Sequence, residues 1–198
     1  YLLKKYDVPV PRYTSYPTMP YWDTEKFTTE KWIESVRKTF DETNDVKGIS
    51  LYIHLPFCES LCTYCACNTR ITKNHNVEVQ YIRSLLKEWE QYKKIFGKRP
   101  IIRELHLGGG TPTFFSAKNL RWLIMYLLEE CNIHDTHEFS FEGHPNNTIA
   151  EHLRTHFDFG FRRVSFGVQD LDDKVQRTIN RIQPFENLRK VTSVSRTM

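Results

Sequence analysis

The stretch GISLYIHLPFCESLCTYCAC, residues 48–67, decides the fold. Residues 48–55 are rich in aliphatic and aromatic side chains and favour a β-strand. The strand leads directly into a loop in which Cys58, Cys62 and Cys65 follow C-x-x-x-C-x-x-C spacing, and Cys67 comes two residues later. Strands that deliver reactive groups into the loops after them are typical of α/β enzymes with parallel strands.

The cysteine spacing points to metal chemistry. Three thiolates can hold three irons of a four-iron cluster and leave the fourth iron open, whereas an electron-transfer ferredoxin uses four cysteine ligands. A structural zinc site is the alternative, with Cys67 or His54 completing the tetrahedron. A disulfide framework is disfavoured, because four of the five cysteines crowd into residues 58–67 and Cys131 has no partner.

Length and composition indicate one soluble unit. The chain has 198 residues, 39% of them hydrophobic, which is enough for a core. The net charge of +4 is mild and interleaved, so we expect no nucleic-acid partner. No apolar run reaches membrane-spanning length, and residues 1–5 are not followed by a signal-peptide core. These features predict a cytoplasmic protein without membrane attachment, and we expect a monomer.

The order of expected elements predicts the fold class. Proline-rich residues 1–24 indicate an extended arm, and Thr28 or Thr29 is expected to cap a helix over 30–39. Strand, loop and helix then alternate, which requires a parallel sheet with right-handed crossovers. The expected strands are 48–55, 101–107, 138–142 and 163–168, and the expected helices are 77–96, 116–131, 149–157 and a segment after 172.

This pattern predicts an α/β fold: a partial TIM-like barrel of parallel strands with outer helices, preceded by the arm and its helix. We divide the chain into an arm-and-helix segment, 1–46, and a barrel domain, 47–198. The units are too few to close an eight-stranded barrel. Residues 193–198 read as a helix cut off before a further strand, so the sheet is either a partial barrel or part of a longer chain.

Further polar groups follow the strands. The run Gly108-Gly109-Gly110-Thr111-Pro112 lets backbone groups approach a polar ligand, or forms only a tight turn. Tyr64 offers an aromatic face for an adenine, or simply packs. Three residues near strand ends suit ribose, amino and carboxylate groups, or are solvated surface groups: Glu142, Gln169 and Arg181. Four histidines are expected in surface helices and loops without a role: His134, His137, His152 and His156.

Together these motifs resemble a known family. The cysteine spacing, with Tyr64 before the third cysteine, and the run 108–112 are similar to those of radical S-adenosylmethionine enzymes. More narrowly, the chain resembles the oxygen-independent coproporphyrinogen III oxidases of anaerobic haem synthesis. That resemblance rests on PRYTSYPT (11–18), YIHLPFC (52–58), the C-x-C ending at Cys67, GVQD (167–170) and NR (180–181).

The resemblance implies a reaction. Cys58, Cys62 and Cys65 would bind a [4Fe-4S] cluster whose open iron chelates S-adenosylmethionine. Cleavage of that cofactor gives methionine and a 5′-deoxyadenosyl radical, which removes a hydrogen atom from a propionate of coproporphyrinogen III. Loss of carbon dioxide and one electron leaves a vinyl group, and two rounds give protoporphyrinogen IX. The electron donor and electron acceptor are unidentified partners.

The resemblance also implies residue roles. Cys67 would be catalytic, near the cluster but outside its ligand set. The residue types of the arm leave two interpretations: the arm closes over the substrate, with its arginine meeting carboxylates and its aromatic rings the macrocycle, or it is a passive structural strap. The expected substrate contacts are Arg12, Tyr13 and Tyr16. The expected cofactor contacts are Tyr52, Tyr64, Gly109, Gly110, Thr111, Glu142, Gln169 and Arg181.

Two departures from the family pattern stand out. His144 occupies a position where the family usually has an acidic or amide residue. The family's next strand and its carboxyl-terminal domain are not present, so we expect an amino-terminal portion and an incomplete enzyme. Two alternatives stay open, a haem-chaperone paralogue with the same cysteine and glycine loops and a non-catalytic metal-stabilised module.

Overall fold

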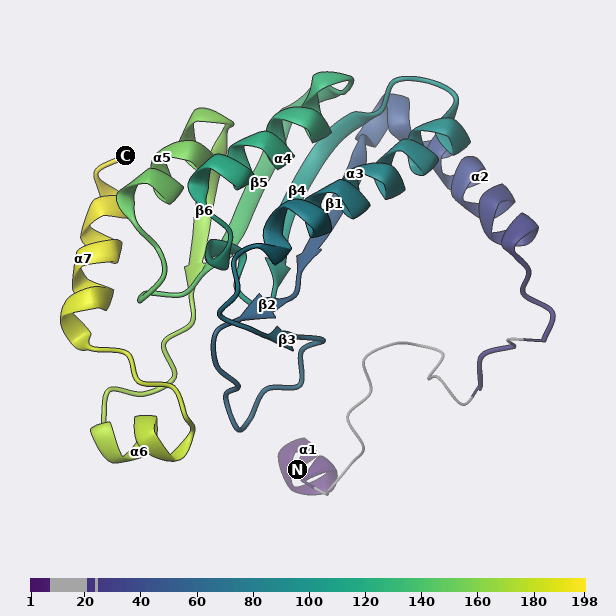
Figure 1. Cartoon of the computed structure of the whole chain (residues 1–198). Helices are drawn as coiled ribbons and strands as arrows, with labels where there is room; N and C mark the ends of the chain where they lie inside the picture. The colour runs from purple at the N-terminus through teal and green to yellow at the C-terminus, as the bar shows by residue number, and fades with distance from the viewer. Residues whose placement is uncertain (8–20, 24) are drawn as a thin grey trace.

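The structure, a computed structural model, describes residues 1–7, 21–23 and 25–198. Four strands form one parallel sheet: β1 (Ile49–Leu55), β4 (Ile101–Gly109), β5 (Asn132–Gly143) and β6 (Phe161–Phe166). They lie side by side in the order β1-β4-β5-β6 (Figure 1). The predicted α/β arrangement of parallel strands is therefore confirmed.

Helices connect successive strands. The crossovers are α3 (Val77–Phe96), α4 (Ala117–Glu129) and α5 (Ala150–Asp158), and α7 (Phe185–Arg196) follows β6 after the short α6 (Asp173–Thr178). Helix α2 (Thr29–Lys47) precedes β1. The remaining elements are α1 (Leu2–Tyr6), the 3₁₀ turn η2 (Pro112–Phe114), and a second, two-stranded sheet of β2 (Phe57–Cys58) and β3 (Arg70–Ile71). Within the described residues, no helix is long and apolar enough to cross a membrane.

Local sequence explains the helix ends. Helix α3 ends at Gly97, whose φ of 68° is left-handed and whose N–H donates to the carbonyl of Lys93. Helix α4 begins after Ser116, whose hydroxyl accepts from the N–H of Asn119. Thr28 caps α2 in the same way. Helices α3 and α4 each bury one mainly apolar face, so their positions follow from the sequence pattern.

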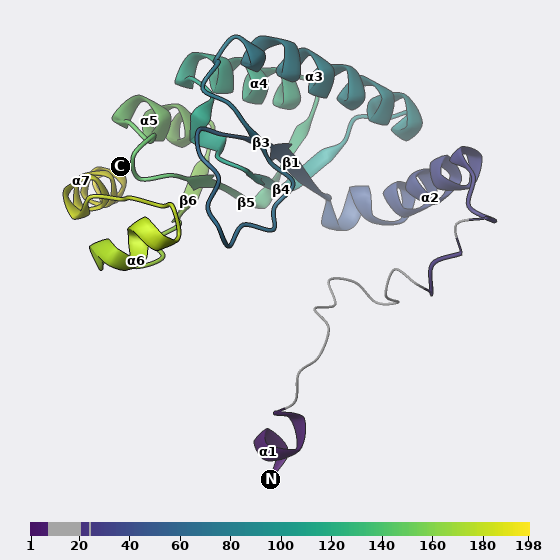
Figure 2. The ribbon, with the colours of Figure 1, turned by 60° about the horizontal axis from the view of Figure 1, so that its bottom comes forward.

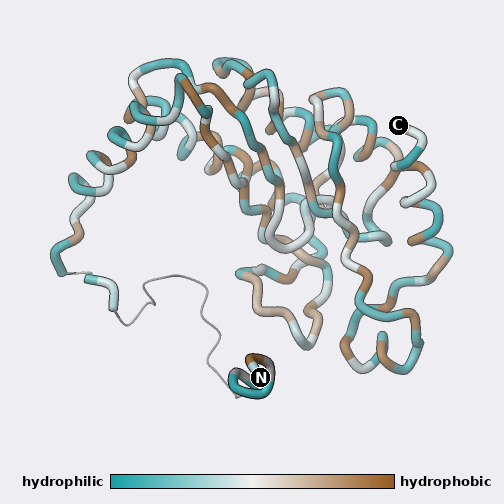
Figure 3. Tube along the Cα trace, turned by 180° about the vertical axis from the view of Figure 1, so that it is seen from behind, coloured by the Kyte–Doolittle hydropathy of each residue, from teal (hydrophilic) through white to brown (hydrophobic). Residues whose placement is uncertain are grey.

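The two faces of the main sheet differ in chemistry. Helices α3, α4 and α5 cover one face, while the strands lie open on the other when the molecule is viewed from behind (Figures 2 and 3). Strand side chains that are fully buried under the helices include Leu55, Leu105 and Leu107. The other face carries the row Tyr52, His106 and Ser140, paired across three strands. A parallel sheet is usually apolar on both faces, so this polar row sets the open face apart from the face under the helices.

Several expectations need correction. The predicted arm is not extended throughout, because Leu2–Tyr6 is helical; the prolines that disfavour a helix begin only at Pro9. Helix α2 continues to Lys47, beyond the predicted end at Thr39. The polar residues of its last turns weaken the apolar pattern from which helices are predicted, but no helix breaker occurs before Gly48. The expected substrate contacts Arg12, Tyr13 and Tyr16 lie outside the described residues.

Strand β5 is longer than predicted. It begins at Asn132 because residues 132–133 pair with Ile101 and Ile102 of β4, before a register irregularity. The mostly exposed, polar stretch that follows lacks the apolar alternation from which strands are predicted. Pairing with the neighbouring strand decided this element.

Two histidines are buried, contrary to the expectation of surface positions. His152 and His156 have 5% and 1% of their surface exposed. His152 donates from Nε2 to the carbonyl of Phe115, and His156 donates from Nδ1 to the carbonyl of His152. The ring of His156 stacks on Phe141 with centroids 3.7 Å apart, and its Nε2 has no partner in the described structure. Both histidines therefore behave as flat core side chains.

Burial of His156 predicts acid sensitivity. Burial lowers the pKa of His156 from 6.5 to about 4. As the pH falls, His156 is therefore protonated in the unfolded chain before it is protonated in the folded chain. Its effect on the free energy of unfolding is absent above about pH 6.5, and the folded state loses stability as the pH falls towards 4. We expect His156→Phe to retain about 2 kcal/mol more of its unfolding free energy than the wild type when the pH is lowered from about 7 to about 5. Urea titrations at both pH values measure this, with exposed His137→Gln as control, and equal losses in all three proteins would contradict it.

Candidate functional site

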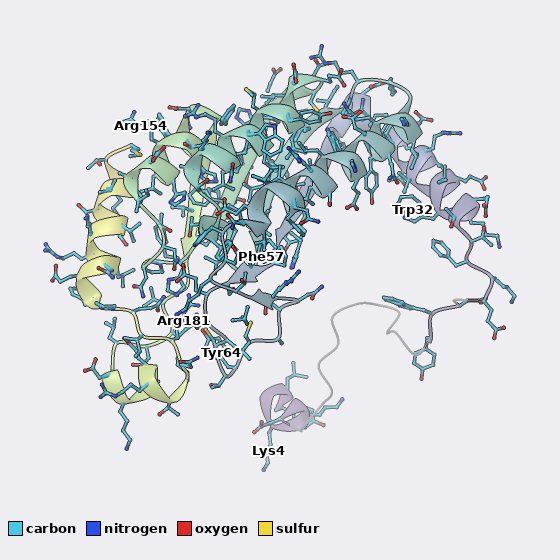
Figure 4. All side chains as sticks on the ribbon, viewed as in Figure 1. Lys4, Trp32, Phe57, Tyr64, Arg154 and Arg181 are labelled. Atoms are coloured by element: carbon cyan, nitrogen blue, oxygen red, sulfur yellow. The ribbon has the colours of Figure 1, made fainter. Side chains whose placement is uncertain are left out.

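The predicted site residues meet in one cavity at the carboxyl ends of the strands. Its volume is about 350 Å³. In Figure 4 the labelled Tyr64 and Arg181 lie close together at this end of the sheet, far from Trp32 and Arg154. From the predicted set, the lining contains Cys58, Cys62, Tyr64, Cys65, Cys67, Gly109, Gly110, Thr111, Glu142, Gln169 and Arg181.

A larger groove lies elsewhere. Its volume is about 740 Å³, and it runs between α2, β1 and α3. Its lining includes Trp32, Phe40 and Trp89 but none of the predicted site residues. Size therefore does not identify the site, whereas the gathering of polar and thiol groups in the smaller cavity does.

The cysteine loop is closed at its base by backbone hydrogen bonds. The N–H of Arg70 donates to Pro56 O at 2.8 Å, and that of Thr72 donates to Cys58 O at 2.8 Å. These bonds belong to the small β2–β3 sheet, which sequence patterns did not predict because each strand has only two residues. All thiols are free; Cys58, Cys62 and Cys65 are partly buried and Cys67 is exposed.

The glycine loop lies directly on the cysteine loop. Gly110 and Thr111 donate from their backbone N–H groups to Leu55 O at 2.9 Å and Phe57 O at 3.0 Å. A Cβ on Gly110 would lie 2.6 Å from Pro56 O and 3.0 Å from Cys58 Sγ. The predicted close approach is therefore real, but at Gly110 the approaching group is the cysteine loop itself. Gly109, with φ of 118°, supplies the turn.

Glu142 is held from two sides. Its Oε2 accepts from the N–H of Gly109 at 3.2 Å, and its Oε1 lies 3.5 Å from His106 Nε2. His106 Nδ1 lies 2.8 Å from Ser140 Oγ, so the serine hydroxyl orients the ring. This arrangement presents a carboxylate in the cavity whose orientation is set by the backbone and by an imidazole.

Tyr52 lies beside the cavity without lining it. Its ring stacks on His106 at 5.8 Å between centroids, and its hydroxyl donates to His54 Nδ1 at 3.0 Å. Burial, and then the nearby Glu142 and Cys67, raise the pKa of the Tyr52 phenol. Tyr52 has 55% of its surface exposed. The expected direct contact from Tyr52 to a bound cofactor stays a prediction.

Sequence reasoning missed His106 and Ser140. Both belong to the row on the open face of the sheet, and the hydrogen bond between them positions Glu142 two residues after Ser140. The period-2 alternation of each strand was the available signal, since His106 and Ser140 are polar residues between buried Leu105, Leu107, Phe139 and Phe141. Their meeting also depends on the register between strands.

Arg181 joins the cysteine loop to the strand ends. Its Nη1 donates to Cys62 Sγ at 3.6 Å, and its Nη2 donates to Gly167 O at 2.9 Å. Its Nε is buried and has no hydrogen-bond partner among the described residues. A buried guanidinium donor without a partner at a cavity wall fits an anionic ligand group such as a carboxylate.

Burial favours the protonated form of the Cys58 and Cys67 thiols in the metal-free chain, because it raises the pKa of each. It raises the pKa of Cys58, and the neighbouring Cys65 and Cys62 raise it further, while Thr111 and Arg181 act in the opposite direction. Burial and Cys65 also raise the pKa of Cys67. Burial raises the pKa of Tyr64 to about 12. Metal binding at Cys58 would therefore release the proton of that thiol, as is general for thiolate ligands.

The single-zinc alternative finds little support. Across residues 1–7, 21–23 and 25–198, no three His, Cys, Asp or Glu side chains are gathered as one ion requires. His54 donates from Nε2 to Asn68 O at 2.7 Å and accepts at Nδ1 from Tyr52. Both nitrogens are engaged, so His54 does not complete a tetrahedron here.

His144 is neutral at the cavity wall. Burial, and then Arg181, lower the pKa of His144 to about 4. Its Nδ1 accepts from the N–H of Asn146 at 3.2 Å, and its own N–H donates to Thr113 Oγ1 at 3.2 Å. The departure from the family pattern therefore leaves a satisfied turn, and Glu142 keeps its own contacts.

We expect Gly110→Ala to separate the two loops. The added Cβ would meet backbone atoms of Pro56, which cannot rotate away, so the cost should be about 1–3 kcal/mol of unfolding free energy. Urea titration measures this, and faster alkylation of Cys58 would report the displaced loop. Gly97→Asn is the matched control, because it has a left-handed φ and open space around the Cβ position. An unchanged stability for Gly110→Ala would contradict the packing described.

Comparisons with known proteins identify the family of this chain. The profile of the Radical SAM superfamily matches residues 52–194. Oxygen-independent coproporphyrinogen III oxidases from Helicobacter pylori (strain J99) and Pseudomonas aeruginosa are 40% and 36% identical over 97% and 100% of this chain. The chain spans 42% of the length of each of these relatives.

A solved structure has the same fold. Coproporphyrinogen III oxidase from Escherichia coli, described as a radical SAM enzyme, superposes with a TM-score of 0.85 at 32% identity. The match covers 99% of this chain and 42% of that one. With the profile match over most of its length, this chain belongs to the radical SAM superfamily.

Proposed function

We propose that Cys58, Cys62 and Cys65 hold a [4Fe-4S] cluster and that S-adenosylmethionine binds beside it in the 350 Å³ cavity. The observation that carries this proposal is the meeting of those thiols with the glycine loop, Glu142 and Arg181 in one cavity. When bound, the cluster supplies the electron that cleaves S-adenosylmethionine to methionine and a 5′-deoxyadenosyl radical.

The residues of this chain bind and orient the cofactor in this proposal. The Arg181 guanidinium, whose Nε has no partner in the described part of the chain, takes the carboxylate of the methionine part. Glu142, oriented by His106 and Gly109, accepts from amino or ribose hydroxyl groups. Tyr64 offers its exposed ring to the adenine, and Gln169 adds an amide at the same wall.

We propose further that the protein oxidatively decarboxylates two propionates of coproporphyrinogen III to vinyl groups, giving protoporphyrinogen IX. This reaction would remove one hydrogen atom, one carbon dioxide and one electron from each propionate, and the electron would pass to a separate acceptor. The names of the relatives support this substrate. Free thiols support a reducing, cytoplasmic setting, where an electron donor can reduce the site.

Three assays separate this proposal from its alternatives. Anaerobic reconstitution should give about four irons and four sulfides per chain, where a zinc-stabilised module would give one zinc. Incubation with reductant and S-adenosylmethionine should release 5′-deoxyadenosine. With the full-length protein, coproporphyrinogen turnover without stable haem binding supports the oxidase, and the reverse result supports the haem chaperone. Absence of 5′-deoxyadenosine from a fully reconstituted protein would overturn the proposal.

We expect Cys58→Ala, Cys62→Ala and Cys65→Ala each to abolish the cluster. Removing one of three thiolates leaves a second iron exposed and prone to oxidation. The visible absorption of the reconstituted protein measures this. Cys131→Ala is the matched control, since that thiol is buried in the core and bonded to Leu127 O, and it should keep the absorption. Survival of the absorption in any of the three variants would show the ligand assignment to be wrong.

Cys67→Ser should keep its iron and impair turnover in the full-length protein. Cys67 lines the same cavity but is exposed, and a fourth thiolate ligand would block cofactor chelation. Iron analysis and coproporphyrinogen turnover are measured on the same preparation. Loss of iron would instead indicate a four-cysteine site.

A further inference from the structure

A turn far along the chain is hydrogen-bonded to the cysteine loop. The turn comprises Ile179, Asn180 and Arg181, directly after α6. Ile179 O accepts from the N–H of Thr63 at 3.1 Å, and Asn180 Nδ2 donates to Leu61 O at 2.7 Å. The Arg181 guanidinium reaches Cys62 Sγ between them. Three consecutive residues therefore contact three consecutive residues of the cysteine loop.

Asn180 has an unusual backbone. Its φ of 52° makes it the one non-glycine residue with positive φ in the described chain. Asparagine tolerates this conformation better than most residues, but glycine would adopt it more readily. A side chain kept at such a position indicates that the side chain has a task, and here it makes the short hydrogen bond to Leu61 O.

The buried side-chain amides of Gln176 and Gln183 connect the turn to residues outside the cysteine loop. Gln176 is 4% exposed, and its Nε2 donates to Asp170 O at 2.8 Å while its Oε1 accepts from the N–H of Gln183. Gln183, 3% exposed, donates to Gly167 O at 2.9 Å. The N–H of Arg181 also donates to Gln176 O. The turn is therefore a firm support that does not depend on the cysteine loop.

The cysteine loop has few bonds of its own. Between residues 59 and 67, the described backbone–backbone hydrogen bonds are Cys65 N–H to Cys62 O and Thr63 N–H to Ile179 O. Other contacts come from Asn147 Nδ2, which donates to Glu59 Oε1 at 3.0 Å, and from His75, whose Nε2 lies 3.9 Å from the same oxygen. Within the loop, Tyr64 contacts Cys62 and Cys67 contacts Cys65. Leu61 O and Thr63 N–H are therefore tied to the rest of the protein by the turn, while Cys62 also has contacts inside the loop.

We propose that Asn180 is a positioning residue that holds the cysteine loop in shape before any metal arrives. Its amide fixes Leu61 O, and with the Thr63–Ile179 bond it keeps Cys62 beside Arg181. A well-ordered loop should also shield a bound cluster from air, and this consequence rests on the proposed cluster at Cys58, Cys62 and Cys65. The order of the loop in the metal-free chain does not depend on that cluster.

Two variants and a control test this role. Asn180→Gly keeps the positive φ and removes the amide, while Asn180→Ala removes the amide and strains the turn. Thr178→Ala is the control, because the Thr178 hydroxyl donates to Lys174 O within the same helix, α6, and not to the cysteine loop as described. In the metal-free full chain, hydrogen exchange of the peptide covering residues 59–67 should become about two- to tenfold faster in both Asn180 variants. Exchange in Thr178→Ala should match the wild type.

A second measurement concerns the reconstituted protein. Both Asn180 variants should take up as much iron as the wild type, and their visible absorption should bleach faster in air. If the peptide covering residues 59–67 exchanges at the wild-type rate in Asn180→Gly and faster only in Asn180→Ala, the amide of Asn180 is not needed. Asn180 would then serve only to form the turn, and the proposal would be overturned. If no protein, wild type included, reconstitutes a cluster, the proposed function fails while the exchange data still decide the role of Asn180.

Discussion

The site depends on one backbone contact between two loops. The N–H groups of Gly110 and Thr111 donate to Leu55 O and Phe57 O, and this extends the β1–β4 pairing beyond the ends of both strands. The contact leaves no space for a side chain on Gly110 and brings Thr111 Oγ1 to 3.3 Å from Cys58 Sγ. The first cysteine is therefore placed by strand pairing, which the hydrophobic core under the sheet stabilises.

Buried hydrogen bonds extend this order outward. Glu78 is 2% exposed, and its Oε2 accepts from Ser116 N–H at 2.9 Å and Asn119 Nδ2 at 2.7 Å. His75 Nδ1 donates to the other oxygen at 2.7 Å and its ring stacks on Phe114. This carboxylate ties the start of α3 to the start of α4, so the turn that follows the glycine loop is held from the helix side as well.

Prediction succeeded where local chemistry is sufficient and failed where it is not. The span Val77–Phe96 was predicted with its observed bounds, because an amphipathic pattern and a terminal Gly97 define a helix without tertiary help. The burial of His152 and His156 was missed, since a histidine on a helix face reads as polar until a carbonyl and a phenyl ring are placed against it. The same holds for His106, whose partners Ser140 and Glu142 come from the next strand.

The sequence by itself determined the parallel α/β order, the cysteine and glycine loops, and most of the polar residues at the strand ends, because periodicity and motif spacing are local properties. Tertiary structure alone decided that Tyr52 lies beside the cavity, and that Arg181 donates to Cys62 across 119 residues of chain. It also decided that the side-chain amide of Asn180 donates a hydrogen bond to Leu61 O. Such contacts depend on strand register and on loop paths over the sheet edge, and no local pattern encodes the distance between two loops.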